Sequence, residues 1–145
     1  MPPVRILVID DDPFVLRMTT RMLSGFDCVT ATARSGPEGI ERFRRSLPDL
    51  VITDVAMPVP QGLEAIRTLR ELAPTLPILA ISGGGWLTNC ADLLEMARRA
   101  GATDSLAKPF TIEQLRTAVS CCLIAQGSAP MPRRQPVADA QPVPD

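Results

Sequence analysis

The chain has 145 residues, of which 46% are hydrophobic and 21% are charged. This length and composition are typical of one globular domain with a real core, and they leave too little chain for two domains of ordinary size. The 15 Lys and Arg residues nearly balance the 16 Asp and Glu residues, which argues against a nucleic-acid surface, and no apolar run is long enough to span a bilayer. We therefore expect one cytoplasmic domain that binds neither nucleic acid nor a membrane.

Cysteine and histidine usage argues against two common kinds of site. The four cysteines show no CxxC spacing and the chain has no histidine, so a zinc site is not expected. The absence of histidine also excludes a Ser-His-Asp or Cys-His catalytic arrangement. Any phosphohistidine that takes part in the function must therefore come from a partner.

The first predicted element is a strand over Val4–Ile9, a short run rich in β-branched residues and apolar except at Arg5, of the kind that is buried on both faces of a parallel sheet. Helix-length segments separate it from four further expected strands, which cover Cys28–Ala33, Leu50–Thr53, Ile78–Ile81 and Ser105–Ala107. This alternation of strands and helices predicts an α/β fold.

Capping residues predict where the helices begin and end. Asp12 followed by proline is a typical start, and Ser35-x-x-Glu38 and Thr111-x-x-Gln114 are capping-box patterns. Gly101 is expected to end a fourth helix that begins near Asn89. Apolar stripes predict the core-facing sides of the first helix (Val15, Met18, Met22, Leu23) and of the last (Ile112, Leu115, Val119, Cys122).

The composition changes after Ile124. Residues 127–145 contain five prolines, few large apolar residues and no helical or strand period, which predicts a disordered tail. We expect one domain over residues 1–126, with no covalently attached output domain visible in this sequence.

Polar residues follow four of the predicted strands. Asp10 and Asp11 follow the first strand, Asp54 the third, Ser82 the fourth and Lys108 the fifth. In an open parallel sheet the ligand site lies beyond the carboxyl ends of the strands, so these side chains are expected to converge on one edge.

Each residue type in this set suits phosphoryl transfer. Clustered carboxylates repel one another unless a divalent cation offsets their charge, and Mg²⁺ prefers such oxygen ligands. Asp54 can then attack phosphorus while the Lys108 ammonium stabilises charge on the phosphoryl oxygens. The Ser82 hydroxyl can donate a hydrogen bond to one of those oxygens.

Taken together, these segments resemble the response-regulator receiver family. The matching segments are Ile9-Asp10-Asp11-Asp12, Asp54-Val55-Ala56-Met57-Pro58 with Gly62, Ile81-Ser82-Gly83 and Lys108-Pro109-Phe110. They occur in family order within a region from Val4 to Ile124. The resemblance implies a flavodoxin-like three-layer sandwich around a doubly wound five-stranded parallel sheet of order 2-1-3-4-5.

The resemblance also implies roles for individual residues. Asp54 would be the phosphoacceptor, Asp11 a direct Mg²⁺ ligand, Asp10 a ligand through water, and Ala56 a ligand through its main-chain carbonyl. Asp54, Ser82 and Lys108 would carry the chemistry, and a cis peptide would join Lys108 to Pro109.

One departure from the family pattern concerns the switch. Three residues before the lysine, the family often has an aromatic side chain that turns inward on phosphorylation, but this chain has Ser105 there and no tyrosine at all. We therefore expect Ser82 and Ser105 at the switch positions, without the usual aromatic relay.

The expected function is that of a stand-alone receiver that switches signalling states rather than turning over a substrate. It would accept a phosphoryl group from a sensor histidine kinase or a histidine phosphotransfer protein. A downstream protein target would then bind the face built from the fourth helix, the fifth strand and the fifth helix. The protein would be a monomer or a weak homodimer.

Two other functions are open from the sequence. Ser105 and the absent output domain are compatible with a scaffold that has the receiver fold and works without phosphorylation. Asp10-x-Asp12 after an apolar strand faintly resembles the nucleophile motif of haloacid-dehalogenase-type phosphatases, although Phe14 occupies the place of the usual Thr or Val.

Overall fold

The computed structural model describes residues 2–57, 59–83, 90–125, 127 and 131. Strands and helices alternate along this part of the chain, as the sequence predicts. In chain order they are β1 (Val4–Ile9), α1 (Pro13–Leu23), β2 (Cys28–Ala33), α2 (Gly36–Ser46), β3 (Leu50–Asp54), α3 (Val59–Leu72), β4 (Ile78–Ser82), α4 (Cys90–Ala100), β5 (Asp104–Ala107) and α5 (Ile112–Ala125).

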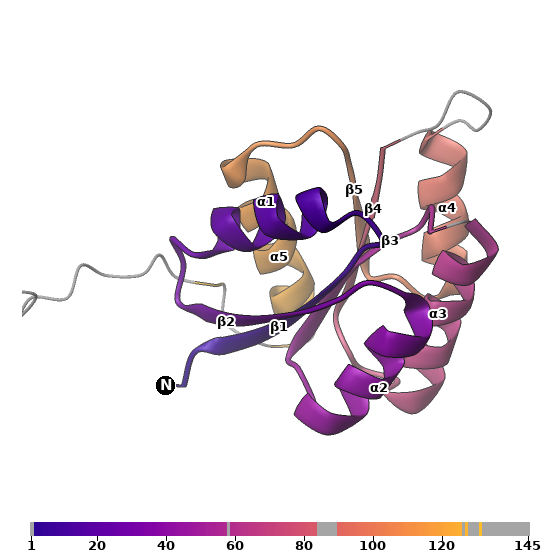
Figure 1. Ribbon diagram of the computed structural model, residues 1–145, viewed down its shortest axis with the longest axis horizontal. Coiled ribbons are helices and arrows are strands. Elements are labelled where there is room, and N and C mark those ends of the chain that lie inside the picture. Colours follow the sequence, from indigo (N-terminus) through magenta and orange to yellow (C-terminus); the bar gives the residue numbers. More distant parts are fainter. Residues whose placement is uncertain (1, 58, 84–89, 126, 128–130, 132–145) are drawn as a thin grey trace, which may run out of the picture.

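The strands form one parallel sheet of order β2-β1-β3-β4-β5. Helices α1 and α5 cover one face of the sheet, and α2, α3 and α4 cover the other (Figure 1). The predicted doubly wound three-layer sandwich and its strand order are confirmed. Because every strand runs in the same direction, the carboxyl ends of β1, β3, β4 and β5 lie along one edge.

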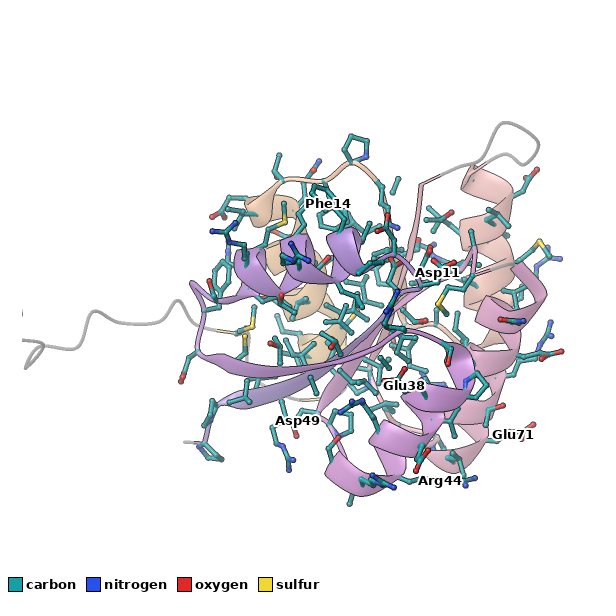
Figure 2. The ribbon with its side chains drawn as sticks, in the orientation of Figure 1. Asp11, Phe14, Glu38, Arg44, Asp49 and Glu71 are labelled. Atoms are coloured by element: carbon teal, nitrogen blue, oxygen red, sulfur yellow. The ribbon has the colours of Figure 1, made fainter. Side chains whose placement is uncertain are left out.

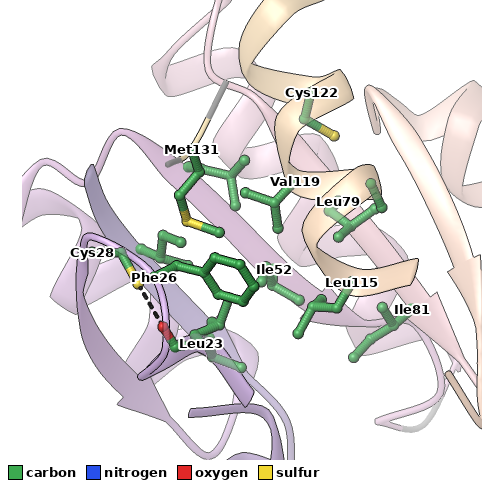
Figure 3. Packing of buried hydrophobic residues seen from close by; sticks show 14 of the residues in the cluster. Leu23, Phe26, Cys28, Ile52, Leu79, Ile81, Leu115, Val119, Cys122 and Met131 are labelled. Atoms are coloured by element: carbon green, nitrogen blue, oxygen red, sulfur yellow. Dashed lines mark hydrogen bonds between the residues drawn. The ribbon is translucent and has the colours of Figure 1, made fainter. Parts of the chain in front are cut away.

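Two hydrophobic clusters fill the space between the sheet and its helices. The α1/α5 cluster includes Ile6, Val8, Leu16, Leu23, Phe26, Cys28, Ile52, Leu79, Leu115, Val119, Cys122, Leu123 and Met131, and Figure 3 shows part of it. The α2–α4 cluster includes Leu7, Ile9, Phe43, Val51, Ile66, Leu69, Ile78, Ala80 and Leu93. Neighbouring residues of β1 alternate between the two clusters, since successive side chains of a strand point to opposite faces.

The predicted strand bounds agree with the structure to within one residue. β1 and β2 have the expected bounds, β3 and β4 each continue one residue further, and β5 begins one residue earlier. Helix α4 begins at Cys90, and the predicted start near Asn89 lies outside the described residues.

The predicted core faces of the first and last helices need correction. The fully buried residues of α1 are Leu16, Thr19 and Leu23, whereas Val15, Met18 and Met22 are only half-buried. The prediction is confirmed at Leu23, but it omitted Leu16 and also Thr19, a residue that a count of apolar side chains cannot find. On α5 the side chain of Ile112 is 48% exposed because it lies in the first turn, while the other three predicted core residues are buried.

The predicted helix caps are present. Asp12 accepts a hydrogen bond from the Phe14 amide (2.9 Å), and Ser35 accepts one from the Glu38 amide (3.2 Å). Thr111 and Gln114 form a reciprocal pair, with distances of 3.1 Å and 2.8 Å. Gly101 follows α4 with φ +128°, as expected of a glycine that ends a helix.

The chain after α5 keeps contact with the domain at Met131. This residue lies in the predicted tail, but it is only 2% exposed and belongs to the α1/α5 cluster. Residues 128–130 and 132–145 lie outside the described part of the chain, so the predicted boundary at residue 126 and the disordered tail stay predictions there. Within the described residues, no helix is both long and apolar enough to cross a membrane.

Candidate functional site

The predicted site residues lie at the carboxyl-end edge of the sheet. Asp10 directly follows β1, Asp54 and Ser82 end β3 and β4, and Lys108 directly follows β5. Parallel pairing in register sets these ends side by side: Asp54 pairs with Ile81 and Ser82 with Ala107. Figure 2 shows Asp11 on this edge, between the layer that contains α1 and the layer that contains α2 and α3.

Three carboxylates and one ammonium meet at this edge. One carboxylate oxygen from each of Asp10, Asp11 and Asp54 lies within 4.8 Å of the others. Lys108 Nζ lies 3.1 Å from Asp10 Oδ2 and 3.7 Å from Asp54 Oδ2. The fold therefore brings together residues that are up to 98 positions apart in the sequence.

Main-chain amides orient the two buried carboxylates. The Asp12 amide donates a hydrogen bond to Asp10 Oδ1 at 2.9 Å, and the Ala56 amide donates one to Asp54 Oδ1 at 3.3 Å. In each carboxylate it is the other oxygen, Oδ2, that lies near Lys108. Each of the two carboxylates therefore has a main-chain amide near Oδ1 and the Lys108 ammonium near Oδ2.

Burial makes the charge of this cluster unfavourable. Asp10 is fully buried and Asp54 is 5% exposed. Loss of water raises the pKa of Asp10, and the nearby Asp54 charge raises it further, against the lowering effect of the Asp12 amide and Lys108. Loss of water likewise raises the pKa of Asp54, which Lys108 and the Ala56 amide partly counteract.

The donor set fits a hard divalent cation. Three carboxylates carry up to three negative charges, and Lys108 returns only one positive charge within salt-bridge distance of two of them. A bound Mg²⁺ would offset the remaining charge, and it prefers carboxylate oxygens with open positions for water and phosphate. Asp10, Asp11 and Asp54 are the residues that could hold it.

The remaining predicted site residues lie around this cluster. Ser82 is fully buried at the end of β4, and the Lys108 amide donates to its carbonyl at 2.9 Å. The peptide between Lys108 and Pro109 is cis, as the resemblance implies. Ala56 is exposed beside Asp54, and a metal contact through its carbonyl stays a prediction. Ser105 lies on β5 and is half-buried.

Gly62 supports the site in a way that sequence reasoning missed. It lies in the first turn of α3, and an added Cβ there would collide with the carbonyl oxygen of Val55, the residue after Asp54. Only glycine lets α3 begin so close to the Asp54 loop. The sequence motif includes Gly62. The close approach of Gly62 to Val55, seven residues earlier, is visible only in the folded chain.

Comparisons with known proteins agree with this geometry. A family profile described as the response regulator receiver domain matches residues 6–120. Among curated proteins, the chain is 38% identical over 122 residues to a C4-dicarboxylate response regulator, DctR, of Halalkalibacterium halodurans, covering 82% of this chain and 51% of that protein. It is 35% identical over 126 residues to the transcriptional regulatory protein PrrA of Mycobacterium tuberculosis, covering 86% and 52% respectively.

A solved structure matches over almost its whole length. The response regulator receiver domain protein from Clostridium thermocellum superimposes with a TM-score of 0.76 at 29% identity, covering 86% of this chain and 97% of that one. The chain spans about half the length of the curated relatives it matches.

The chain belongs to the response regulator receiver family. Members of this family are signalling switches in two-component systems, are phosphorylated on an aspartate and interact with histidine kinases. They bind Mg²⁺ in an acidic pocket, and the described residues of this chain include the acidic cluster of Asp10, Asp11 and Asp54.

Proposed function

We propose that Asp54 is the phosphoacceptor of this receiver and that its chemistry depends on Mg²⁺, Lys108 and Ser82. One observation carries the proposal: Lys108 Nζ lies 3.7 Å from Asp54 Oδ2, within a group of three carboxylates at the carboxyl ends of the strands. A buried carboxylate held between an ammonium and two other acids is suited to phosphoryl transfer and has no evident structural purpose.

The transfer step follows from the positions of these side chains. An Asp54 oxygen attacks phosphorus, an O–P bond forms, and the bond from phosphorus to the donor breaks, so the donor leaves with that electron pair. The Lys108 ammonium stabilises charge on the phosphoryl oxygens, and the Ser82 hydroxyl donates a hydrogen bond to one of them. The Ala56 amide keeps the Asp54 carboxylate oriented throughout.

A divalent cation held by Asp10, Asp11 and Asp54, with the Ala56 carbonyl as a further ligand, would supply charge neutralisation as the phosphoryl group approaches. Before that, Asp10 and Lys108 hold each other in place by an ion pair of 3.1 Å. Lys108 is therefore positioned for the phosphoryl group by the same acid that helps to bind the cation.

A sensor histidine kinase or a histidine phosphotransfer protein is the proposed phosphoryl donor, since the chain itself has no histidine. The proposed output surface is the face formed by α4, β5 and α5. A groove of about 370 Å³ lies on its β5 and α5 part, lined by Asp104, Ser105, Leu106, Glu113, Gln114, Thr117, Ala118 and Cys121. Ser105 lines this groove at the position where, by its resemblance to the family, an aromatic side chain is often expected.

The deciding experiment is intact-mass spectrometry after incubation with acetyl phosphate and Mg²⁺. We expect one phosphoryl adduct in the wild type, and none in Asp54→Asn or in a sample treated with EDTA. Asp92→Asn, an exposed acid on α4, is the matched control and should be modified like the wild type. Lys108→Gln should be modified much more slowly, because the ammonium near Asp54 is lost.

An adduct that persists in Asp54→Asn would refute the assignment of the phosphoacceptor. No adduct with acetyl phosphate or with a phosphorylated phosphotransfer protein would favour the scaffold function that the sequence leaves open. A scaffold would also bind its partner equally well as wild type and as Asp54→Ala, which a pull-down with both proteins would show.

The phosphatase alternative gains no support from the site. That mechanism needs Asp12 as an active-site acid, but Asp12 is exposed and its Oδ1 accepts the hydrogen bond that caps α1. Action in trans, freedom from nucleic acid, a cytoplasmic location and a monomeric or weakly dimeric state stay predictions of the sequence. The matched curated relatives are about twice as long as the aligned region, and one of them is named a transcriptional regulatory protein.

A further inference from the structure

Met131 is buried although it follows the last helix by six residues. Its side chain is 2% exposed, which is as low as that of Leu123 within α5. It belongs to the same hydrophobic cluster as Phe26 and Cys28, and in Figure 3 its side chain points toward the ring of Phe26. A thioether next to an aromatic ring is a favourable contact.

The site that Met131 occupies lies at the amino-end edge of the sheet. Leu23 ends α1, and Cys28 begins β2 and pairs with Val4, the first residue of β1. Figure 3 shows Met131 on the side of the cluster where Cys28 and Phe26 lie. Asp10 follows the opposite end of β1, which is about 17 Å away at the usual rise of a strand. Met131 therefore docks at the edge of the domain that faces away from the acidic site.

The chain makes a defined turn before it reaches this site. Gly127 has φ +81°, in the region that favours glycine, and its amide donates a hydrogen bond to the Ile124 carbonyl at 2.9 Å. Four residues span at most about 14 Å, so a turn at Gly127 allows Met131 to return to the end of α5 and the neighbouring strands.

The sequence around Met131 favours docking. Pro130 and Pro132 flank it. Proline restricts the free chain, so less conformational entropy is lost when a segment of this composition is ordered. Methionine itself is unbranched and fills irregular apolar gaps.

We propose that Met131 is a docking residue through which the chain after α5 binds its own domain, in an apolar socket formed by the end of α1, the start of β2 and α5. This contact adds a side chain from beyond α5 to the core of the domain. It does not depend on the proposed phosphorylation of Asp54.

Methionine oxidation in the intact wild-type chain tests the docking directly. After brief treatment with hydrogen peroxide, peptide mass spectrometry gives the oxidation rate of each methionine. Met57 (3% exposed) is the buried reference and Met96 (43% exposed) is the exposed reference. We expect Met131 to be oxidised at least about tenfold more slowly than Met96, at a rate near that of Met57. Oxidation of Met131 at the rate of Met96 would overturn the proposal.

Two matched variants test the contribution of the contact to stability. Met131→Gln retains an unbranched side chain of similar length but buries an amide, and Met96→Gln makes the same change at an exposed position. The thermal midpoint should fall by roughly 4 °C or more in the first variant and stay unchanged in the second. Equal midpoints for Met131→Gln and the wild type would contradict docking. Both variants should still form the adduct with acetyl phosphate, which separates this test from that of the proposed function.

Thiol reactivity gives an independent measure of whether the socket is covered. Cys28 is 5% exposed and its Sγ lies 3.3 Å from the Leu23 carbonyl (Figure 3), whereas Cys121 is exposed. Met131→Gly should increase the rate at which iodoacetamide alkylates Cys28, relative to Cys121 in the same molecule. An unchanged ratio of the two rates would show that Met131 does not cover this part of the core.

Discussion

Asp10 and Asp54 occupy positions where their ionised forms are costly. Both carboxyl groups are buried at the edge of the sheet, and removal of water raises both pKa values. Lys108 offsets part of this cost at distances of 3.1 Å and 3.7 Å. In the absence of a cation, the folded state should therefore favour the protonated form of these acids more than the unfolded state does.

The pH dependence of stability should reveal this cost. A group whose pKa is raised on folding stabilises the fold below its unfolded pKa, near 3.8 for Asp, and this contribution is lost as pH rises through the higher folded pKa. In EDTA at pH 7, Asp54→Asn should be more stable to urea than the wild type, and the difference should shrink as the pH falls toward 4. Added Mg²⁺ should also reduce the difference, because the cation stabilises only the wild-type carboxylate cluster.

Asp92→Asn makes the same change at an exposed acid and is the control for this measurement. It should not show the gain in stability at pH 7 in EDTA that is expected of Asp54→Asn. An Asp54→Asn curve that ran parallel to the wild-type curve from pH 4 to pH 8 would mean that the Asp54 carboxylate is not destabilised by burial.

The residues of the site could be predicted because each lies at the carboxyl end of a predicted strand. Asp10, Asp54, Ser82 and Lys108 all lie where the strand pattern placed them. What the sequence could not show is how these side chains are held. The amides of Asp12 and Ala56 orient the two buried acids, and amide positions depend on backbone geometry rather than on residue type.

At the scale of elements, Gly62 sets how closely α3 can approach the loop after Asp54. Gly62 lies in the first turn of α3, against the carbonyl of Val55. Any larger residue must push the helix away from the loop that follows Asp54, which couples the packing of α3 to the position of the proposed phosphoacceptor.

Gly62→Ala should therefore lower both stability and phosphorylation. We expect a loss of about 1–3 kcal/mol in the free energy of unfolding, measured with urea, from overpacking. Adduct formation with acetyl phosphate should also be slower under conditions in which the variant is still folded. Gly36→Ala is the matched control: it also lies in a first helical turn, but an added Cβ there meets its nearest neighbour, Ala65 Cβ, at an ordinary 3.4 Å.

Gly36→Ala should be neutral or slightly stabilising, because alanine restricts the unfolded chain. If both glycine variants lost the same stability, the general helix environment and not the contact with Val55 would be responsible.

Elements with strong local signals were predicted well, and those shaped by packing were predicted less well. The predicted bounds of β1 and β2 match the structure residue for residue, and the caps at Asp12, Ser35 and Thr111 are local hydrogen bonds. The core face of α1 was predicted less well because it is set by how α1 lies against the sheet and α5. That orientation buries Thr19, a residue that an apolar count omits.

Across the whole molecule, Arg70 joins parts of the chain that have no local reason to meet. Its guanidinium donates to the Gly101 carbonyl at 2.7 Å and 3.0 Å, and to the carbonyls of Ala73 (3.2 Å) and Pro74 (2.9 Å). These carbonyls follow the ends of α3 and α4. Nothing in the sequence distinguishes Arg70 from the other arginines, because its partners are 31 residues away or belong to a turn.

Arg70→Lys should lower the free energy of unfolding by roughly 1–2 kcal/mol. Lysine keeps the charge but cannot place several planar donors on carbonyls at two helix ends. Arg67→Lys, an exposed change on the same helix, should have almost no effect in the same urea titration. If Arg70→Lys were as stable as Arg67→Lys, the positive charge of Arg70 and not its planar set of donors would account for its contribution to stability.

The alternation of β1 between the two clusters has an energetic consequence. Ile6 and Val8 pack with α1 and α5, whereas Leu7 and Ile9 pack with α2, α3 and α4. The sheet thus acts as a partition between the two clusters. A cavity created by a substitution in one cluster is lined by different side chains from a cavity created in the other.

Double-mutant cycles should therefore be additive across the partition. Ile66→Val and Val119→Ala lie in different clusters, and their coupling energy should be below about 0.5 kcal/mol. Leu79→Ala and Val119→Ala lie in one cluster and should couple more strongly. A receiver built this way can accumulate changes on the two faces of its sheet independently, with the backbone of five strands between them.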